Sequence, residues 1–563
     1  MAGTIMLLLV FLLALFTLTV YSELIANINC GGSPVDWYSM TWSPDDTLIS
    51  NGVTRVVQPS NSINPVVDTL RVFTSRKKNC YSIGSKLQGI KVLVRATFYY
   101  GNYDQLSNPP TFDLHFDGNF WTTVETDTDY VIRYETTYVA KGDSVSVCVA
   151  QTKPRQFPFI SALEVRRVDP EVYEVVDKNR ALFLRVRINF GANETIRYPL
   201  DKYDRIWRYF NILPKIVTNN ELVDTSHTAN NLPSEIFQTA IESTTESFYL
   251  GSYSPSGPPV YIIMYFSEAT KLISSTLKRS FAIYRTSIFE STPLSVSFSP
   301  PYGSALDRFL YNFKVDDLTA ISINETSDSV LPPLISAMET FNISNVLTDG
   351  TNSNDVKALA LLQSTFQVLR GWSSDPCLPA PYSWDWLNCS DDPMPRITSL
   401  NLASFNLSGS LPDISSMDAL EIINLADNQF SGSIPTSLRT NNKLTLNVTG
   451  NPSLCTPDKS CSSSPADNTP DTQKKQQSML RLIVFISILV FLGSVLVTVL
   501  AWYFLCMRKT RPNGNPPVVQ GNIHHGPIIA NLVPRTDEQI VNGYAVPKGG
   551  EPAPLTHVRP GNY

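Results

Sequence analysis

One short segment gathers side chains that could hold a sugar. The stretch FYYGNYD contains three tyrosines, an amide and an acid where an aromatic run gives way to a turn: Tyr99, Tyr100, Asn102, Tyr103 and Asp104. Aromatic rings stack on the C–H faces of sugars, while amides and carboxylates form hydrogen bonds with hydroxyl groups. The segment therefore predicts a ligand site. Because Tyr and Phe also alternate along buried strands, the alternative is that most of these rings belong to a core, with Tyr103 and Asp104 reaching solvent.

Catalytic signals are weak by comparison. Only two histidines, His115 and His227, precede the long apolar segment at 482–507, and no H-E-x-x-H, G-x-S-x-G or Walker loop occurs. A glycosidase needs only two carboxylates at a suitable separation, and no carboxylate is singled out by its surroundings. We therefore expect no enzyme activity, no catalytic residues, no metal and no cofactor, with a glycosidase as the alternative.

The elements that must position the tyrosine segment have the pattern of β-strands. From residue 24 to about residue 200, β-branched and aromatic runs of four to eight residues alternate with Gly, Asn, Pro and Asp. This pattern is typical of an antiparallel sandwich. A second set of such runs follows, so we expect two consecutive β-sandwich domains, 24–200 and 201–367, with the boundary between Asp201 and Pro233.

Two apolar segments predict how the chain meets a membrane. Residues 482–507 contain no Asp, Glu, Lys, Arg or His, and a helix of this length exceeds a hydrocarbon core of about 30 Å. Residues 1–22 have the pattern of a signal peptide. Charges on the two sides of the span balance, so the orientation depends on the signal peptide and on six N-x-S/T sequons. All six precede the span: Asn193, Asn324, Asn342, Asn388, Asn406 and Asn447. We expect a single-pass type I glycoprotein with an extracellular N-terminus.

An internal repeat lies between the second sandwich and the span. ITSLNLASFNLSGSLPD and LEIINLADNQFSGSIPT superimpose with an offset of 23 residues, which places Leu400 on Ile423. The pattern predicts a short leucine-rich repeat solenoid at 370–461, in which Asn428 satisfies backbone groups between coils. So few repeats are marginal without support.

The eight cysteines suggest how the solenoid is closed. Cys377 with Cys389, and Cys455 with Cys461, are close local pairs that would cap its two ends, each closure contributing roughly 3 kcal/mol. Three further cysteines precede them: Cys30, Cys80 and Cys148. Because that number is odd, one of the three is a buried thiol or pairs outside this set, and the pairing stays open.

Several motifs resemble the plant malectin-like family over roughly residues 27–366: CGGSPVDW, NCYSI, VRATFYYGNYDQLSNPPTFDL, QFPFISALEVR, RINFGANETIRYPLDKYDRIW, YIIMYFSEA and VLPPLISAMETF. Two positions depart from the pattern: Tyr265 stands where relatives usually have His, and SSDPC (373–377) replaces Gly-Asp-Pro-Cys. The resemblance implies malectin-like sandwiches, and it adds Trp121 and Phe159 to the ligand-binding candidates. It also implies a carbohydrate or a peptide as ligand.

The remaining segments complete the expected organisation. A Ser/Pro-rich stalk occupies 462–478, and 508–563 contains nine Pro and seven Gly but no kinase motif, which predicts a disordered cytoplasmic tail. The predicted fold is mainly β: tandem malectin-like sandwiches, a leucine-rich repeat solenoid, one transmembrane helix and the tail. We expect a kinase-less receptor-like protein of the plasma membrane that acts with a receptor kinase and binds no nucleic acid. The alternatives are a non-signalling tether between cell wall and membrane, and a cell-wall glycosidase.

Overall fold

The computed structural model describes residues 24–210, 215–219, 221–252, 257–272, 276–286, 291–314, 320–455, 540–541 and 544–545. The expected signal peptide, stalk and transmembrane segment lie outside these residues, as does most of the tail. The two short tail strands, β33 (Ile540–Val541) and β34 (Tyr544–Ala545), pair with each other. Within the described ranges, no helix is long and apolar enough to cross a membrane.

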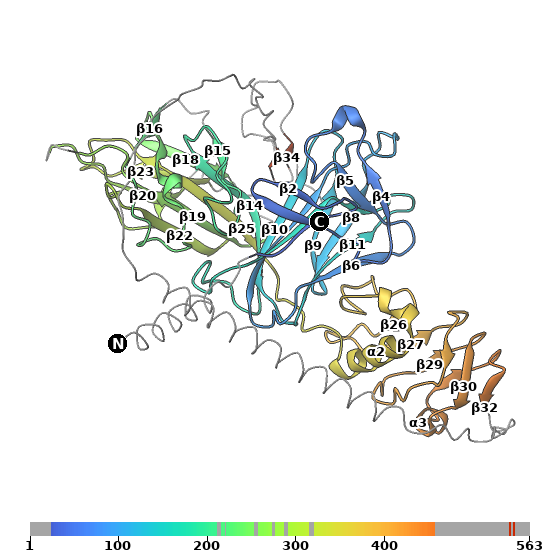
Figure 1. Cartoon of the computed structure of the whole chain (residues 1–563). Coiled ribbons are helices and arrows are strands. Elements are labelled where there is room, and N and C mark those ends of the chain that lie inside the picture. Colours follow the sequence, from blue (N-terminus) through green and yellow to red (C-terminus); the bar gives the residue numbers. More distant parts are fainter. Residues whose placement is uncertain are drawn as a thin grey trace, which may run out of the picture. The chain divides into compact units, whose positions relative to one another are not determined.

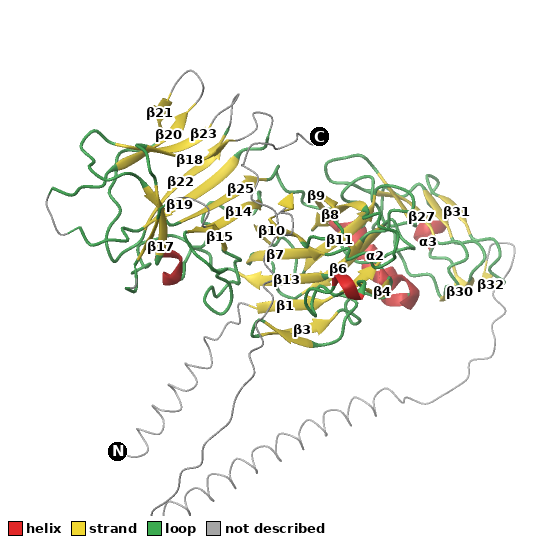
Figure 2. Ribbon diagram, turned by 90° about the horizontal axis from the view of Figure 1, so that it is seen from above, coloured by secondary structure: helices red, strands yellow, loops and turns green. Residues whose placement is uncertain are grey.

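The prediction of a mainly β protein is confirmed, but the two sandwiches share one long sheet (Figures 1 and 2). Along the sheet the strands are β2 (Val35–Trp37), β3 (Met40–Pro44), β1 (Leu24–Asn29), β13 (Ala162–Arg167), β7 (Lys91–Phe98), β10 (Ile132–Val139), β14 (Leu182–Phe190), β25 (Ala337–Ile343), β19 (Val260–Phe266) and β22 (Leu306–Phe313). A further strand, β15 (Arg208–Phe210), pairs with β14. Because β14 pairs antiparallel with β10 on one side and with β25 on the other, backbone hydrogen bonds join the two sandwiches.

Smaller sheets complete the two sandwiches. The first has β6 (Lys78–Ile83), β11 (Val145–Gln151), β8 (Thr111–Phe116) and β9 (Asn119–Glu125), with β12 (Phe159–Ile160), β5 (Thr69–Val72) and β4 (Val53–Val56) as a separate sheet. The second has β18 (Ser247–Ser252), β23 (Ala320–Glu325), β20 (Phe281–Thr286) and β21 (Ser291–Pro293), with β16 (Ile216–Thr218), β17 (Thr239–Glu242) and β24 (Leu334–Ile335) as a separate sheet. Short 3-10 turns are η1 (Pro59–Asn61) and η2 (Ser234–Phe237).

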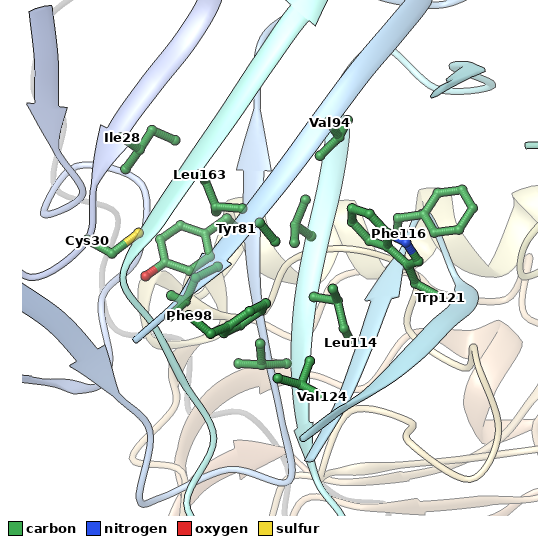
Figure 3. Close-up of a cluster of buried hydrophobic side chains, with 14 of the residues drawn as sticks. Ile28, Cys30, Tyr81, Val94, Phe98, Leu114, Phe116, Trp121, Val124 and Leu163 are labelled. Atoms are coloured by element: carbon green, nitrogen blue, oxygen red, sulfur yellow. The ribbon is translucent and has the colours of Figure 1, made fainter. Parts of the chain in front are cut away.

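The core of the first sandwich is built from side chains that several strands turn toward one another. Figure 3 shows Val94 and Phe98 from β7, Leu114 and Phe116 from β8, and Leu163 from β13 in one buried cluster. Burying such a side chain contributes about 1.5–3 kcal/mol. This cluster anchors the strands from which the candidate site extends.

Charged side chains are buried where the two sandwiches meet. The Arg95 guanidinium on β7 contacts carboxylates of Glu135 at 2.8 Å, Glu164 at 2.8 Å and Asp204 at 3.2 Å. Arg187 on β14 extends this network, since it contacts Glu135 at 2.8 Å and Glu339 on β25 at 2.6 Å. The network therefore links strands of both sandwiches through paired charges.

A solenoid follows the second sandwich. It begins with α2 (Ser353–Thr365) and η3 (Gln367–Gly371), and one sheet holds β26 (Leu387–Cys389), β27 (Ile397–Asn401), β29 (Ile422–Asn424) and β31 (Thr445–Asn447). The second sheet holds β28 (Ser408–Gly409), β30 (Gln429–Ser433) and β32 (Ser453–Cys455), and a short helix, α3 (Thr436–Arg439), lies between β30 and β31. The strands β27, β29 and β31 pair in parallel, as do β28 and β30, whereas β26 pairs antiparallel with β27. The sequence pattern did not predict α2, whose apolar face packs into the solenoid core.

The register of the solenoid confirms the 23-residue offset. Leu400 on β27 pairs with Ile423 on β29, which pairs with Leu446 on β31. The prediction for Asn428 is also confirmed. Its side-chain nitrogen donates to the Leu402 carbonyl at 2.8 Å, and its side-chain oxygen accepts from the Leu407 amide at 2.9 Å. Consecutive coils are therefore joined by buried hydrogen bonds.

The structure resolves most of the cysteine pairing. Cys377 and Cys389 form the expected disulfide, and Cys80 on β6 pairs with Cys148 on β11. Cys30 is a buried thiol, which is one of the two outcomes that the odd count allowed. Cys455 is disulfide-bonded, while its expected partner Cys461 lies outside the described residues.

The first sandwich supports the start of the solenoid. The Lys78 ammonium on β6 donates to the carbonyls of Asp375 and Leu378 at 2.9 and 2.8 Å. The Arg76 guanidinium lies 3.8 Å from the centre of the Trp372 ring, a cation–π contact. These contacts give a short repeat array the support that it lacks alone.

One departure from the malectin-like pattern lies in this junction. Ser374, where the resemblance expects Gly, has a φ of 71°, a conformation that favours glycine. Its hydroxyl oxygen lies 2.8 Å from that of Ser146 on β11. The serine therefore adds a hydrogen bond between sandwich and solenoid at a backbone position that strains it.

His115 makes this junction sensitive to pH. It lies on β8, its ring centre is 5.2 Å from that of Tyr382, and neither ring nitrogen has a hydrogen-bond partner among the described residues. Burial lowers the pKa of His115 to about 3, and the Lys78 charge acts in the same direction. The unfolded chain, with a histidine pKa of about 6.5, takes up this proton when the folded chain does not. Stability is therefore lost as pH falls from about 6.5 toward 3.

We expect His115→Phe to remove this loss. Relative to wild type, the free energy of unfolding should rise by up to about 1.4 kcal/mol for each pH unit below 6.5, because one proton is no longer excluded on folding. Urea unfolding at pH 4, 5, 6 and 7 measures the difference. The control His227→Phe, at an exposed position, should follow wild type. A constant difference between His115→Phe and wild type across this range would contradict the prediction.

Candidate functional site

The loop that follows β7 is fixed by its own side chains. Gly101 and Asn102 have φ of 47° and 52°, and a Cβ added to Gly101 would lie 2.5 Å from Val57. Asn102 accepts a hydrogen bond from the Ser107 amide at 2.9 Å, and Asp104 accepts one from the Leu106 amide at 3.1 Å. These side-chain-to-backbone bonds hold the turn in one conformation.

The loop also forms hydrogen bonds with the segment after β4. The Gln58 amide and the Asn61 side chain both donate to the Gly101 carbonyl, at 3.0 and 3.1 Å. The Tyr99 hydroxyl donates to the Asn61 carbonyl at 2.7 Å. The loop and the β4 segment therefore form one surface of the first sandwich.

Most of the predicted aromatic residues are buried. Tyr99, Tyr100, Trp121 and Phe159 are between 0 and 5% exposed. Tyr100, Phe159 and the half-buried Tyr103 pack against one another beneath the loop, whereas Trp121 packs against Phe116 and Phe183 elsewhere in the core. The buried rings present no open face to a ligand in this structure, as the core alternative expected. Their part in ligand binding stays a prediction.

The polar candidates lie closer to solvent. Asn102, Tyr103 and Asp104 are half-buried, and the Tyr100 hydroxyl donates to the Asp104 carboxylate. Burial and this hydrogen bond raise the pKa of Tyr100 to about 12. Burial raises the pKa of Tyr103 as well, with Asp104 acting in the same direction and Arg55 against it. Tyr100 and Tyr103 therefore stay protonated and able to donate near neutral pH.

The most exposed residues of this surface were not predicted from the sequence. Val56 on β4 is 64% exposed and Leu106 is 70% exposed, and Arg55 and Gln105 are exposed beside them in sequence. We call this surface the loop face and define it by seven residues: Arg55, Val56, Asn102, Tyr103, Asp104, Gln105 and Leu106. It combines apolar side chains with one cation and one carboxylate.

Acidic side chains lie near Tyr99, which precedes the loop. Burial raises the pKa of Tyr99 to about 12, with Asp129, Asp68 and Asp127 acting in the same direction. Asp68 belongs to the loop before β5, and the other two belong to the loop between β9 and β10. No local sequence signal connects these loops, because only the fold brings them together.

The second sandwich offers no comparable opening at Tyr265, the position that departs from the family pattern. Tyr265 is fully buried on β19. Its hydroxyl donates to Glu339 at 2.9 Å and accepts from the Asn230 side chain at 2.9 Å. Tyr265 therefore belongs to the core near the buried charges.

The six predicted glycosylation sites differ in access. Four are exposed: Asn193, Asn388, Asn406 and Asn447. Asn324 on β23 and Asn342 on β25 are half-buried within sheets. Among the described residues, no cluster of three or more His, Cys, Asp or Glu could hold a metal ion.

Known proteins resemble much of this chain in sequence. A family model for the malectin-like domain matches residues 28–343. An uncharacterized Arabidopsis thaliana protein is 34% identical over 332 residues, which cover 58% of this chain and 66% of that protein. A probable LRR receptor-like serine/threonine-protein kinase of the same plant is 32% identical over 426 residues, or 72% of this chain and 46% of the kinase. The chain thus spans about half the length of that kinase.

A solved structure also matches part of the chain. The crystal structure of the ANXUR1 extracellular domain from Arabidopsis thaliana has a TM-score of 0.47 and 19% sequence identity. The match covers 57% of this chain and 97% of that domain.

Proposed function

Because the chain belongs to the malectin-like domain family, we propose that its paired sandwiches form the ligand-binding part of a receptor-like membrane protein. The observation that carries the proposal is the match over residues 28–343, which takes in both sandwiches. A relative named as a receptor-like kinase matches 72% of this chain. The matched part of that kinase is not its catalytic domain, because this sequence contains none of the kinase motifs.

The loop face is the proposed ligand surface, and its composition favours a peptide. Only Tyr103 remains as a half-exposed ring for stacking on a sugar, whereas Leu106 and Val56 offer exposed apolar contacts. Arg55 and Asp104 would orient a ligand that carries both charges, as a peptide does. A carbohydrate ligand is the second candidate, supported by the amide, the carboxylate and the tyrosine hydroxyls around the loop.

We further propose that the protein is secreted and anchored in the plasma membrane. Residues 1–22 would direct the chain into the secretory pathway, and 482–507 would anchor it in the plasma membrane with the sandwiches outside. The 23-residue repeat and its Asn428 hydrogen bonds support a leucine-rich repeat solenoid. We propose no catalytic role for the buried carboxylates Glu135, Glu164 and Asp204, because each is paired with an arginine.

Binding arrays separate the proposal from its alternatives. The secreted segment 24–461 is applied to glycan and peptide arrays, and release of sugar from wall polysaccharides is measured in parallel. A receptor-like protein should bind a narrow set of peptides or glycans and release no sugar. Broad binding to wall polymers alone would favour a tether, and sugar release would favour a glycosidase.

We propose that association with a partner receptor kinase depends on the extracellular part. Replacing residues 512–563 with an unrelated sequence of equal length should leave ligand-dependent co-purification with a malectin-like or repeat-bearing kinase intact. Deleting 375–461 should abolish it, because this removes the solenoid and the backbone groups that bind Lys78. Intact Cys80–Cys148 pairing would show that the sandwich persists in the deletion variant. Loss of co-purification in the tail replacement alone would contradict the proposal.

A further inference from the structure

The larger solenoid sheet has one buried face and one open face. Leu387 on β26, Leu400 on β27 and Ile423 on β29 are aligned in register and 0–4% exposed, so they face the core. Side chains alternate between the faces of a sheet, and their neighbours along each strand therefore point outward. The open face carries Ser399, Asn401, Ile422, Asn424 and Thr445.

Two sequons occupy the two edge strands of this same face. Asn388 on β26 pairs directly with Ser399 on β27, and directly paired residues share a face. Asn447 on β31 is aligned with Asn424 on β29, which is aligned with Asn401 on β27. Both sequon asparagines are exposed. The chain thus places one sequon at each edge of the open face.

We propose that N-linked glycans on Asn388 and Asn447 cover the open face of this sheet. Three strand spacings separate β26 from β31, which is about 14 Å, and a glycan is bulky on this scale. The inference rests on the extracellular placement in the proposed function. It assigns recognition of ligand and partner to the sandwiches and to other surfaces of the solenoid.

The hydrogen bonding of Asn447 is compatible with attachment. Its Nδ2 donates to Asn424 Oδ1 at 3.0 Å, and Asn424 Nδ2 donates to Asn401 Oδ1 at 3.0 Å. Attachment forms a bond from Nδ2 to the anomeric carbon of a sugar carried on a lipid diphosphate. Nδ2 gives up one proton and the lipid diphosphate leaves. The second Nδ2 hydrogen remains for Asn424, so the amide ladder is kept.

Ile422 reports whether the face is covered. It lies mid-sheet and is 49% exposed, an apolar side chain among polar neighbours. A glycan would shield it from large molecules while leaving it open to small ones. Cys30 is buried, so Ile422→Cys would add a thiol that is distinguishable by its position.

The test uses full-length Ile422→Cys protein from plant cells, with and without enzymatic trimming of its glycans. Polymer-linked maleimide and N-ethylmaleimide are applied to separate portions of each sample, and peptide mass spectrometry measures the rate of labelling at residue 422. The polymer should react about tenfold more slowly before trimming, because the bulky glycans exclude it. N-ethylmaleimide should react alike in both samples. The control Leu106→Cys, on the loop face, should react with each reagent at the same rate before and after trimming.

Glycopeptide mapping of the same protein separates the possible failures. Glycans at Asn193 and Asn406 but not at Asn388 and Asn447 would overturn the shielding while leaving the extracellular placement intact. No glycan at any of these four would overturn both. Occupied Asn388 and Asn447 with equal polymer labelling before and after trimming would also overturn the shielding.

Discussion

Arg95→Ala should lower the free energy of unfolding by about 3–5 kcal/mol, because removing one partner of a buried ion pair leaves uncompensated charge. Arg95 is 2% exposed and contacts Glu135, Glu164 and Asp204. Burial alone would raise the pKa of Asp204, but the charges of Arg197, Arg95 and Arg166 hold it well below its usual range. Without Arg95, fewer cations remain to offset the free-energy cost of burying these carboxylates.

Urea unfolding at pH 7 measures this loss, with Arg55→Ala as the matched control. Arg55 is exposed and its guanidinium donates to the Thr54 carbonyl, so its loss should change stability by less than about 0.5 kcal/mol. Lowering the pH should reduce the difference in free energy of unfolding between wild type and Arg95→Ala. Carboxylates with depressed pKa values stabilise above the unfolded pKa near 4, and this contribution is lost as pH falls toward the folded pKa. An Arg95→Ala loss under about 1 kcal/mol at pH 7 would contradict the network's role.

Removing the Cys377–Cys389 disulfide should lower the free energy of unfolding of the solenoid by about 2–5 kcal/mol. The main reason is that the unfolded chain gains conformational entropy when the crosslink is absent. The double variant Cys377→Ser/Cys389→Ser should open the solenoid while the sandwiches stay folded. Hydrogen exchange should therefore rise in 397–447 and remain slow in β7, which lies in the first core.

The control for this variant is Ser410→Ala, at an exposed position in the solenoid. It should leave exchange in 397–447 unchanged. If the double variant also left exchange there unchanged, the disulfide would not cap the repeats. Fast exchange in β7 as well would show that solenoid and sandwich unfold together.

Local patterns predicted the elements that depend on side-chain periodicity. The alternation of apolar and polar residues identified the strands, and the 23-residue offset placed Leu400 beside Ile423. Asn428 was predicted because its position within the repeat fixes its neighbours. These features follow from nearby residues, so one sequence suffices to find them.

Features that depend on distant pairing were not predictable. The role of β14 as the strand between both sandwiches follows from its pairing with β10 and β25. Cys80 and Cys148 are 68 residues apart and meet only because β6 and β11 pair. Arg95 and the three carboxylates that it contacts come from four separate segments, and no local sequence pattern links these segments.

The sequence predicted where the candidate site lies but not which of its side chains are exposed. The tyrosine segment lies on a structured loop, but sequence alternation alone does not separate a buried ring from an exposed one. Tyr99 and Tyr100 face the core, whereas Leu106 is exposed because the Asn102 and Asp104 hydrogen bonds turn the chain outward. The contribution of Arg55 and Val56 required the packing of β4 beside the loop.

Calorimetric titration of one substituted protein tests whether the loop face binds the ligand. Segment 24–461 carrying Leu106→Asp is titrated with the peptide or glycan that the arrays select. The matched control is Val296→Asp in the second sandwich, where the replaced side chain is 81% exposed against 70% for Leu106. Leu106→Asp should weaken binding by at least about tenfold, or 1.4 kcal/mol, while Val296→Asp binds like wild type. Equal affinity of all three proteins would contradict ligand binding at the loop face.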